Sequence, residues 1–246
     1  LLGYHVAITS LFALSLGAHM PEWAPEYRNV ELVLNGTFRG VYQLADLVRL
    51  ESGRVPGVAP SDAGNGSDGT WLMEMSNKER PGNPGATGEP GFATPVYNQW
   101  IFYDTPGTPT TEQATYISDA IGVMETALLA GDGAGWKDLA DATSFADWWL
   151  INELIKNLDS TSFRSSCKIH KLADGATTGK LFMGPLWDQD VSLGLAWGDL
   201  EQTADAVPTG WWTRESVWIL RMWDDTDWRL LVRTRWAAIL TTIEDM

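Results

Sequence analysis

The chain has 246 residues, and its 32 Asp and Glu against 17 Lys and Arg give a formal charge of −15. Such an acidic chain is a poor nucleic-acid binder, because phosphate contacts require clustered Lys and Arg. A single cysteine excludes an internal disulfide and a cysteine-based zinc site. With 44% apolar residues, the chain is long enough for one well-buried core and is not of the disordered class.

The N-terminal residues 1–20 are apolar with polar interruptions, which favours a core helix over a signal peptide or a membrane span. Because the chain starts inside this helix, we expect native sequence to be missing upstream. Residues 28–34 alternate as in a strand, and Asn35-Gly36 predicts a hairpin whose return strand covers 37–44.

The following part of the chain alternates between loops and short extended segments. Residues 52–69 are rich in Gly, Pro, Ser and Asp and are predicted to form a loop. A short strand is predicted over 70–76 and a second loop over 81–91. Residues 94–103 are expected to be extended. The glycine spacing in 81–91 matches no phosphate-binding motif.

The rest of the chain is predicted to be mainly helical. From Thr111, apolar residues recur with a helical period up to a Gly-rich turn at 131–135. Ser144 is expected to cap a helix over 145–158. The tail from Glu215 onward is also expected to be helical.

Two short strands interrupt this helical part, over 167–172 and 180–183, and the turn Asp174-Gly175 is expected to join them. Because strands mostly come first and helices later, the sequence predicts an α+β fold with two lobes.

Asp188 and Asp190 follow an apolar run directly. In an extended segment, residues i and i+2 face the same side, so the two carboxylates are expected to lie together. Buried carboxylates need a cation or hydrogen-bond donors, and hard oxygen pairs suit Mg²⁺, Mn²⁺ or Ca²⁺. The alternative is a surface turn with both aspartates in water.

Asp159 lies just past the end of a strongly apolar helix, where a carboxylate faces the unfavourable end of the helix dipole. Residues that break a local rule in this way are enriched at functional sites. The alternative is an ordinary turn aspartate. A loop aspartate, a short hairpin and a metal-type aspartate follow one another in protein-kinase active sites, and Asp159 and Asp188 have this layout.

Three stretches resemble the spore-coat protein H (CotH) kinase-like family: NGTFRGVYQLAD at 35–46, NLDSTSFRSS at 157–166 and KLFMGPLWDQDVSLG at 180–194. The similarity covers roughly 1–240. It implies an atypical protein-kinase-like fold in a single domain, 1–246. A small β-rich N-lobe would cover approximately 1–103, and a mainly helical C-lobe 104–246.

The resemblance also implies roles for individual residues. Asp159 matches the catalytic-loop aspartate, and Asp188 matches the metal-binding aspartate with Asp190 as a supporting ligand. Ser166 matches a serine of many family members and is a candidate metal ligand. Phe182 matches a position where an aromatic ring packs on adenine.

Two further acidic residues are nominated for nucleotide binding. Asp46 matches a position that is usually Glu, and Glu74 on the strand 70–76 is a weaker candidate for a polar active-site role. The position at which kinases carry a second metal-binding Asn is here Arg164. Arg39 and Lys168 are the nearest basic residues that could contact phosphates.

As a function, the resemblance implies phosphoryl transfer from ATP, with Mg²⁺ or Mn²⁺, to Ser or Thr of secreted or surface proteins such as spore coats. The expected location is extracellular or in a bacterial cell envelope, with no nucleic acid and no membrane span. The alternative is a noncatalytic binding module on the same fold, associated with the cell surface or with glycans. A glycosidase using Asp188 or Asp159 ranks lowest, because no second acidic partner has a recognisable context.

Other conspicuous residues are expected to be structural. Cys167 and the three histidines show no activating partner or ligand spacing. Most of the 14 tryptophans are expected to pack between helices, although exposed ones such as Trp211-Trp212 would suit sugar stacking. The acidic runs Asp224-Asp225 and Asp227 are expected to be solvated charges at a helix start.

Overall fold

The computed structural model describes residues 17, 22–84, 86–131, 135–175, 179–194 and 209–245. The helix expected over 1–20 therefore lies, apart from Gly17, outside the described residues. No helix in the described ranges is long and apolar enough to cross a membrane.

A five-stranded sheet with the order β4-β5-β3-β6-β7 forms the centre of the molecule. Its pairings are all antiparallel, and the strands are β3 (Trp71–Met75), β4 (Gly91–Ala93), β5 (Trp100–Thr105), β6 (Cys167–Lys171) and β7 (Leu181–Met183). Every residue of the two central strands, β3 and β6, is buried. The sheet therefore contains strands that come before the first helices in the sequence and strands that come after them. The α+β mixture is confirmed, and the two-lobed arrangement stays a prediction.

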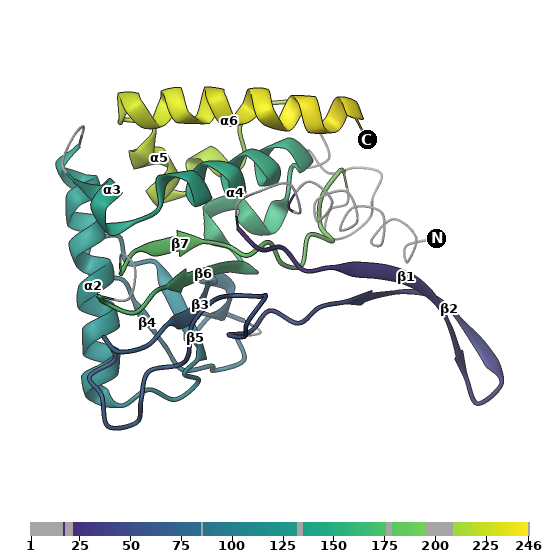
Figure 1. Ribbon diagram of the computed structural model, residues 1–246, viewed down its shortest axis with the longest axis horizontal. Helices are drawn as coiled ribbons and strands as arrows, with labels where there is room; N and C mark the ends of the chain where they lie inside the picture. Colours follow the sequence, from purple (N-terminus) through teal and green to yellow (C-terminus); the bar gives the residue numbers. More distant parts are fainter. Residues whose placement is uncertain are drawn as a thin grey trace.

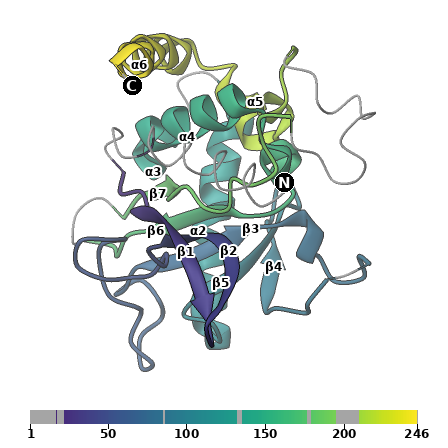
Figure 2. The ribbon, with the colours of Figure 1, turned by 90° about the vertical axis from the view of Figure 1, so that its right-hand side faces the viewer.

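A two-stranded ribbon of β1 (Tyr27–Leu34) and β2 (Thr37–Ala45) projects from this body (Figures 1 and 2). Asn35 and Gly36 connect the strands with positive φ angles of 52° and 75°. These angles are those of the hairpin turn that Asn-Gly favours, so the predicted hairpin is confirmed.

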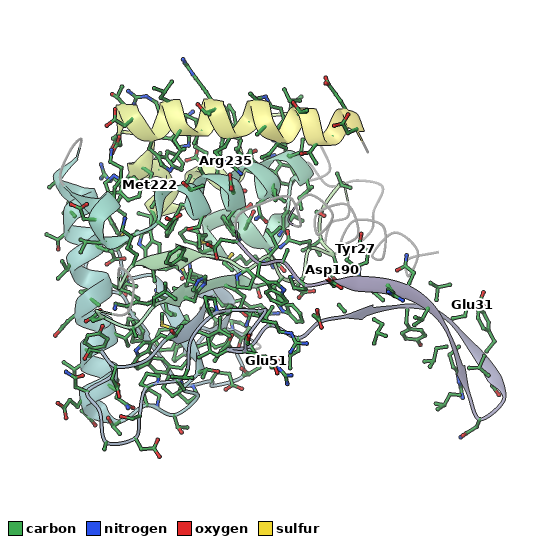
Figure 3. All side chains as sticks on the ribbon, in the orientation of Figure 1. Tyr27, Glu31, Glu51, Asp190, Met222 and Arg235 are labelled. Atoms are coloured by element: carbon green, nitrogen blue, oxygen red, sulfur yellow. The ribbon has the colours of Figure 1, made fainter. Side chains whose placement is uncertain are left out.

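The helices cover the sheet in layers (Figure 1). Their bounds are α2 (Thr111–Ala130), α3 (Trp136–Leu139), α4 (Ala142–Ile155), α5 (Val217–Met222) and α6 (Thr226–Asp245). The α4 helix contacts β7 below it and α6 above it, while α2 crosses one end of the sheet. Asp147 of α4 accepts two hydrogen bonds from the Arg235 guanidinium of α6, at 2.6 and 2.8 Å, and so ties the layers together (Figure 3).

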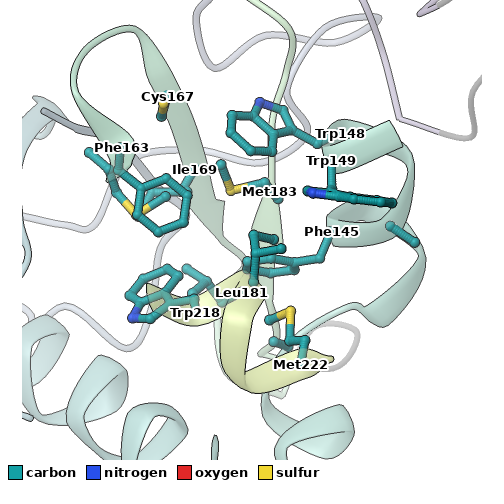
Figure 4. Packing of buried hydrophobic residues seen from close by; sticks show 14 of the residues in the cluster. Phe145, Trp148, Trp149, Phe163, Cys167, Ile169, Leu181, Met183, Trp218 and Met222 are labelled. Atoms are coloured by element: carbon teal, nitrogen blue, oxygen red, sulfur yellow. The ribbon is translucent and has the colours of Figure 1, made fainter. Parts of the chain in front are cut away.

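Aromatic side chains fill the core between α4, α5 and the sheet. Figure 4 shows Phe145, Trp148 and Trp149 of α4 facing side chains of β6, β7 and α5. Five tryptophans are almost fully buried: Trp71, Trp136, Trp149, Trp218 and Trp228. Each buries a large apolar area, so packing is confirmed as their role. Cys167 is also buried, as expected of a structural residue.

The start and end of α4 differ from the prediction. Asp141, not Ser144, is the N-cap: its carboxylate accepts a hydrogen bond from the Ser144 backbone N–H at 2.8 Å. The Ser144 hydroxyl instead accepts from the Met183 N–H at 3.1 Å and so joins the helix to β7. The helix ends at Ile155, because Lys156 has a left-handed φ of 53°.

The tail helix is broken in two, which the sequence analysis did not predict. Asp225 lies at the break and accepts a hydrogen bond from the Trp228 N–H at 3.0 Å. It is only 2% exposed, because the Trp136 indole and the Lys137 ammonium also bind it. The prediction of a solvated Asp225 is therefore wrong, whereas the side chain of Asp227 is 85% exposed.

Residues 91–103 also differ in detail from the predicted loop and extended segment. A short strand already begins at Gly91, and a turn over 95–97 separates it from β5, which begins at Trp100. The single turn of α3 was not predicted.

Candidate active site

Two loops that meet beside the sheet carry the proposed aspartates. Asp159 lies in a 3₁₀ segment, Leu158–Phe163, that follows α4, and Asp188 and Asp190 lie in the loop after β7. The Leu158 N–H donates to the Val191 carbonyl at 3.0 Å, and this bond holds the two loops side by side.

The buried side chain of Asn157 provides a second connection. Its Oδ1 accepts from the Asp159 N–H at 3.1 Å, and its Nδ2 donates to Gln189 Oε1 at 2.9 Å. Gln189 is 2% exposed and lies between Asp188 and Asp190 in sequence. The Asn157–Gln189 hydrogen bond therefore positions both loops, and the sequence analysis missed Gln189.

Asp159 has the properties of a reactive carboxylate. It is 4% exposed, and its Oδ1 has no hydrogen-bond partner among the described residues. Burial, and next the negative charge of Asp188, raises its pKa to about 6, against the opposing charge of Arg164. A buried carboxylate oxygen without a partner needs a proton, a cation or a substrate donor.

Asp188 and Asp190 differ in exposure. Asp188 is exposed and has a left-handed φ of 53°, whereas Asp190 is half-buried. Burial and the charge of Asp188 raise the pKa of Asp190. The Ser166 hydroxyl donates to Asp188 Oδ2 at 3.2 Å, so this bond joins Ser166 to Asp188, whose charge also acts on Asp190.

Glu74 and Lys168 face each other across β3 and β6 and extend this group into the sheet. The Lys168 ammonium lies 2.7 Å from Glu74 Oε2 and 2.5 Å from Asp104 Oδ2. Burial lowers the pKa of Lys168, but the two carboxylates outweigh burial and raise it, so this lysine stays charged. Glu74 Oε1 accepts from the Ser166 N–H at 2.8 Å, which connects Lys168 to Ser166 and Asp188.

An open acidic cleft of about 470 Å³ adjoins this ion pair. It is lined by Glu74, Glu79, Thr87, Glu89, Phe102, Tyr103, Asp104 and Gly107. Its volume is in the range of small-molecule sites. Asp104 was missed by the sequence analysis, and its only sequence signal is a carboxylate inside the apolar strand WIFYDT.

Phe182 and Asp46 lie in other surroundings. The Phe182 ring stacks on His170, with centroids 5.0 Å apart and planes 8° apart. Asp46 accepts a hydrogen bond from Arg54 at 2.8 Å at the base of the ribbon. Within the described part of the chain, neither residue shares a hydrogen bond or ion pair with Asp159 or Asp188.

The oxygen donors of this site fit a hard cation. In the described ranges no three His, Cys, Asp or Glu side chains are close enough to form a complete cage. Mg²⁺ is usually held by one or two carboxylates, with water and phosphate oxygens completing the octahedron. Asp188, Asp190 and Ser166 offer a donor set of this kind beside the unpartnered oxygen of Asp159.

Comparison with known proteins identifies the family of this chain. No curated protein sequence matches the chain at a significant level. The family model described as CotH kinase protein matches residues 8–245, which is nearly the whole chain. The predicted resemblance is thereby confirmed, and the chain belongs to the CotH kinase protein family.

Proposed function

We propose that this protein transfers the terminal phosphoryl group of ATP to Ser or Thr side chains of a protein substrate, with Mg²⁺ or Mn²⁺. One observation carries the proposal: Asp159 and Asp188 lie on two loops that the Asn157–Gln189 hydrogen bond holds together. Protein kinases use this combination of a proton-accepting aspartate and a metal-binding aspartate. The family membership supports the kinase assignment.

Asp159 would act as the proton acceptor for the substrate hydroxyl. Its Oδ1 has no hydrogen-bond partner among the described residues, so a substrate hydroxyl that reaches it could donate to it as the proton leaves. A pKa raised to about 6 leaves the carboxylate ionised at neutral pH and a stronger base than an ordinary aspartate. Asn157 fixes the backbone of Asp159 and thereby the direction of this carboxylate.

Asp188 would hold the metal ion, with Asp190 and Ser166 as further oxygen ligands. When bound, ATP would supply the phosphoryl group and the metal ion would neutralise the negative charge of the phosphates. In a protein with a net charge of −15, such neutralisation matters more than usual, because carboxylates repel phosphate.

Lys168 is the proposed contact to the phosphates. Glu74 and Asp104 hold its ammonium from two sides, and the cleft lined by these two carboxylates lies beside it. A kinase-type Lys–Glu pair has the same role of orienting a lysine toward phosphate oxygens. Phe182 and Asp46 remain proposed nucleotide contacts, and the second face of the Phe182 ring is the one that adenine would use.

The test compares two aspartate variants with a control. We expect Asp188→Ala to abolish Mn²⁺-dependent ATP binding in calorimetry. Asp159→Ala should keep nucleotide binding but lose phosphoryl transfer to a protein acceptor by about 10²-fold or more. Asp119→Ala, an exposed aspartate on α2, serves as the matched control and should change neither.

Unchanged ATP binding in Asp188→Ala would show that the metal assignment is wrong. Full transfer activity in Asp159→Ala would show that Asp159 is not the base.

For the partners, we propose a substrate among secreted or surface proteins, such as a spore coat, and a location outside the cell or in a bacterial envelope. The family assignment supports the proposed location. A noncatalytic, glycan-associated module remains the second candidate, because Arg164 occupies the usual position of a metal-binding Asn and Trp211 is 54% exposed. Titration with ATP and Mg²⁺, against a panel of polysaccharides, separates the two.

A further inference from the structure

A second cavity, of about 650 Å³, lies on the helical side of the molecule between α4, α6 and residues 209–212. Its volume is well within the range of sites for small organic ligands. It is lined by Trp149, Leu150, Glu153, Leu154, Lys156, Gly210, Trp211, Trp223, Val232, Arg233 and Trp236. Four of these residues are tryptophans, and we call this cavity the tryptophan pocket.

The rings of the tryptophan pocket are held in a fixed arrangement. Trp149 stacks on Trp211, with centroids 5.6 Å apart and planes 29° apart. Trp223 meets the Trp149 ring edge-on at 5.1 Å. Trp149 is almost fully buried, whereas Trp211 is 54% exposed. The pocket therefore presents a rigid aromatic wall, part of which faces solvent.

The acceptor groups of the pocket are already used by the protein. The Glu153 carboxylate accepts from Lys156 Nζ at 2.6 Å, from the Trp212 N–H at 3.0 Å and from the Thr213 N–H at 2.8 Å. Lys156 Nζ also donates to the Gly210 carbonyl at 2.6 Å. These bonds hold residues 210–213 beside Glu153 and Lys156. They leave the Glu153 carboxylate and the Gly210 carbonyl little capacity to accept hydrogen bonds from a ligand.

Two guanidinium groups beside the rings, by contrast, have donors that no described carboxylate uses. Arg233 lines the pocket, is exposed and has no ion pair with any described residue. The Arg214 guanidinium lies 5.1 Å from the Trp223 ring centre and 6.0 Å from that of Trp211, likewise without a described carboxylate partner. Among the described residues that line the pocket, Lys156 and Arg233 outnumber the single acid Glu153, which is unusual in a chain of charge −15.

We propose that the tryptophan pocket binds a small organic anion that consists of a flat apolar ring system and one carboxylate or sulfonate group. The exposed ring of Trp211, which Trp149 supports from behind, would stack on the apolar part, and Arg233 would pair with the anionic group. A glycan fits less well, because its many hydroxyl donors need acceptors and the Glu153 carboxylate is occupied. This site is independent of the proposed phosphoryl transfer.

The test uses 2-naphthoate and its uncharged methyl ester on the full chain, with quenching of tryptophan fluorescence and calorimetry as readouts. We expect naphthoate to bind with a Kd below about 1 mM and about 10-fold more tightly than the ester. Arg233→Gln should remove this preference and leave ester binding unchanged. Trp211→Ala should weaken both ligands.

Matched controls lie on the projecting ribbon. Arg28→Gln removes one exposed positive charge, and Phe38→Ala removes an aromatic ring that is 58% exposed. Both should leave naphthoate binding unchanged.

Equal affinity for acid and ester, or full naphthoate binding in Arg233→Gln, would overturn the proposal. The proposal would also be overturned if cellohexaose bound through Trp211 while naphthoate did not bind.

Discussion

The buried Lys168 ammonium is held by two carboxylates, those of Glu74 and Asp104. Replacing Lys168 with Met leaves Glu74 and Asp104 facing each other without a cation. Breaking a buried pair in this way costs about 3–5 kcal/mol. We therefore expect Lys168→Met to lower the free energy of unfolding by that amount, measured by urea denaturation.

A second substitution separates this electrostatic effect from lost packing. Asp104→Asn in the Lys168→Met background removes one of the two unpaired charges and should restore part of the stability. A loss below about 1 kcal/mol in Lys168→Met would mean that the pair behaves like an exposed salt bridge.

Glu22 gives a prediction for the dependence of stability on pH. Burial, with the charges of Asp141 and Asp147, raises its pKa from 4.5 to about 7. Between pH 4.5 and about pH 7, the Glu22 carboxyl keeps its proton in the folded chain but loses it in the unfolded chain. The free energy of unfolding therefore falls as the pH rises through this interval. Glu22→Gln removes that effect. From pH 5 to pH 8, the free energy of unfolding of the variant should therefore rise by up to about 3 kcal/mol relative to that of the parent.

Urea denaturation of both proteins at the two pH values measures this difference. His170, whose pKa is lowered to about 4 by burial, makes the opposite contribution, and its Nε2 lies 3.7 Å from Glu22 Oε2, so the comparison is repeated in a His170→Gln background. Glu26→Gln, at an exposed position, is the control and should show no such gain. A constant difference between Glu22→Gln and the parent from pH 5 to pH 8 would contradict the raised pKa.

Between the elements, the Asn157–Gln189 hydrogen bond is the main side-chain link between the segment of Asp159 and the loop of Asp188. Gln189→Leu keeps the volume but leaves the Asn157 amide with one partner fewer. We expect a stability loss of about 1–3 kcal/mol. If the proposed function holds, kcat should fall about 10-fold or more while the KM for ATP changes little, because the base moves relative to the metal.

Steady-state kinetics with varied ATP gives this separation of kcat from KM. Gln189→Asn and Gln189→Glu keep a side-chain acceptor and should recover part of kcat. An unchanged kcat in Gln189→Leu at a lowered stability would make the link structural only.

Structural features that neighbouring residues encode could be predicted from the sequence. Features that depend on contacts between residues far apart in the sequence could not. The hairpin at Asn35-Gly36 is encoded by two adjacent residues and was predicted correctly. The cap of α4 is Asp141 and not Ser144, because the Ser144 hydroxyl is used by Met183, 39 residues away. The break at Asp225 depends on Lys137, which no local pattern reveals.

The same distinction holds for the candidate site. Asp159 and Asp188 were nominated by their sequence pattern and by family resemblance, and they lie with Ser166 and Glu74 in one bonded or interacting group. Gln189 and Asp104 were missed because their partners, Asn157 and Lys168, are 32 and 64 residues away in sequence.

At the scale of the whole molecule, the ribbon is attached to the body at its base, where Tyr27 of β1 packs against the hydrophobic core. Figures 1 and 3 show the ribbon, with Glu31 on it, extending away from the layered body. Among the described residues, β1 and β2 pair only with each other. Their exposed apolar side chains include Leu32, Val33, Leu34, Phe38, Tyr42 and Leu44. An isolated two-stranded hairpin is only marginally stable in water, so the ribbon adds little to the stability of the body.

Shortening the ribbon tests this conclusion. Replacing residues 30–42 with Asn-Gly keeps the Asn29–Gln43 register pair at its base and removes these exposed apolar side chains except Leu44. We expect the Tm of the body, followed by near-ultraviolet circular dichroism of the buried tryptophans, to stay within about 2 °C of the parent. Met183→Ala in the core is the comparison and should lower the Tm by about 4 °C or more. A shortened ribbon that lowers the Tm as much as Met183→Ala would show that the body depends on the ribbon for its stability.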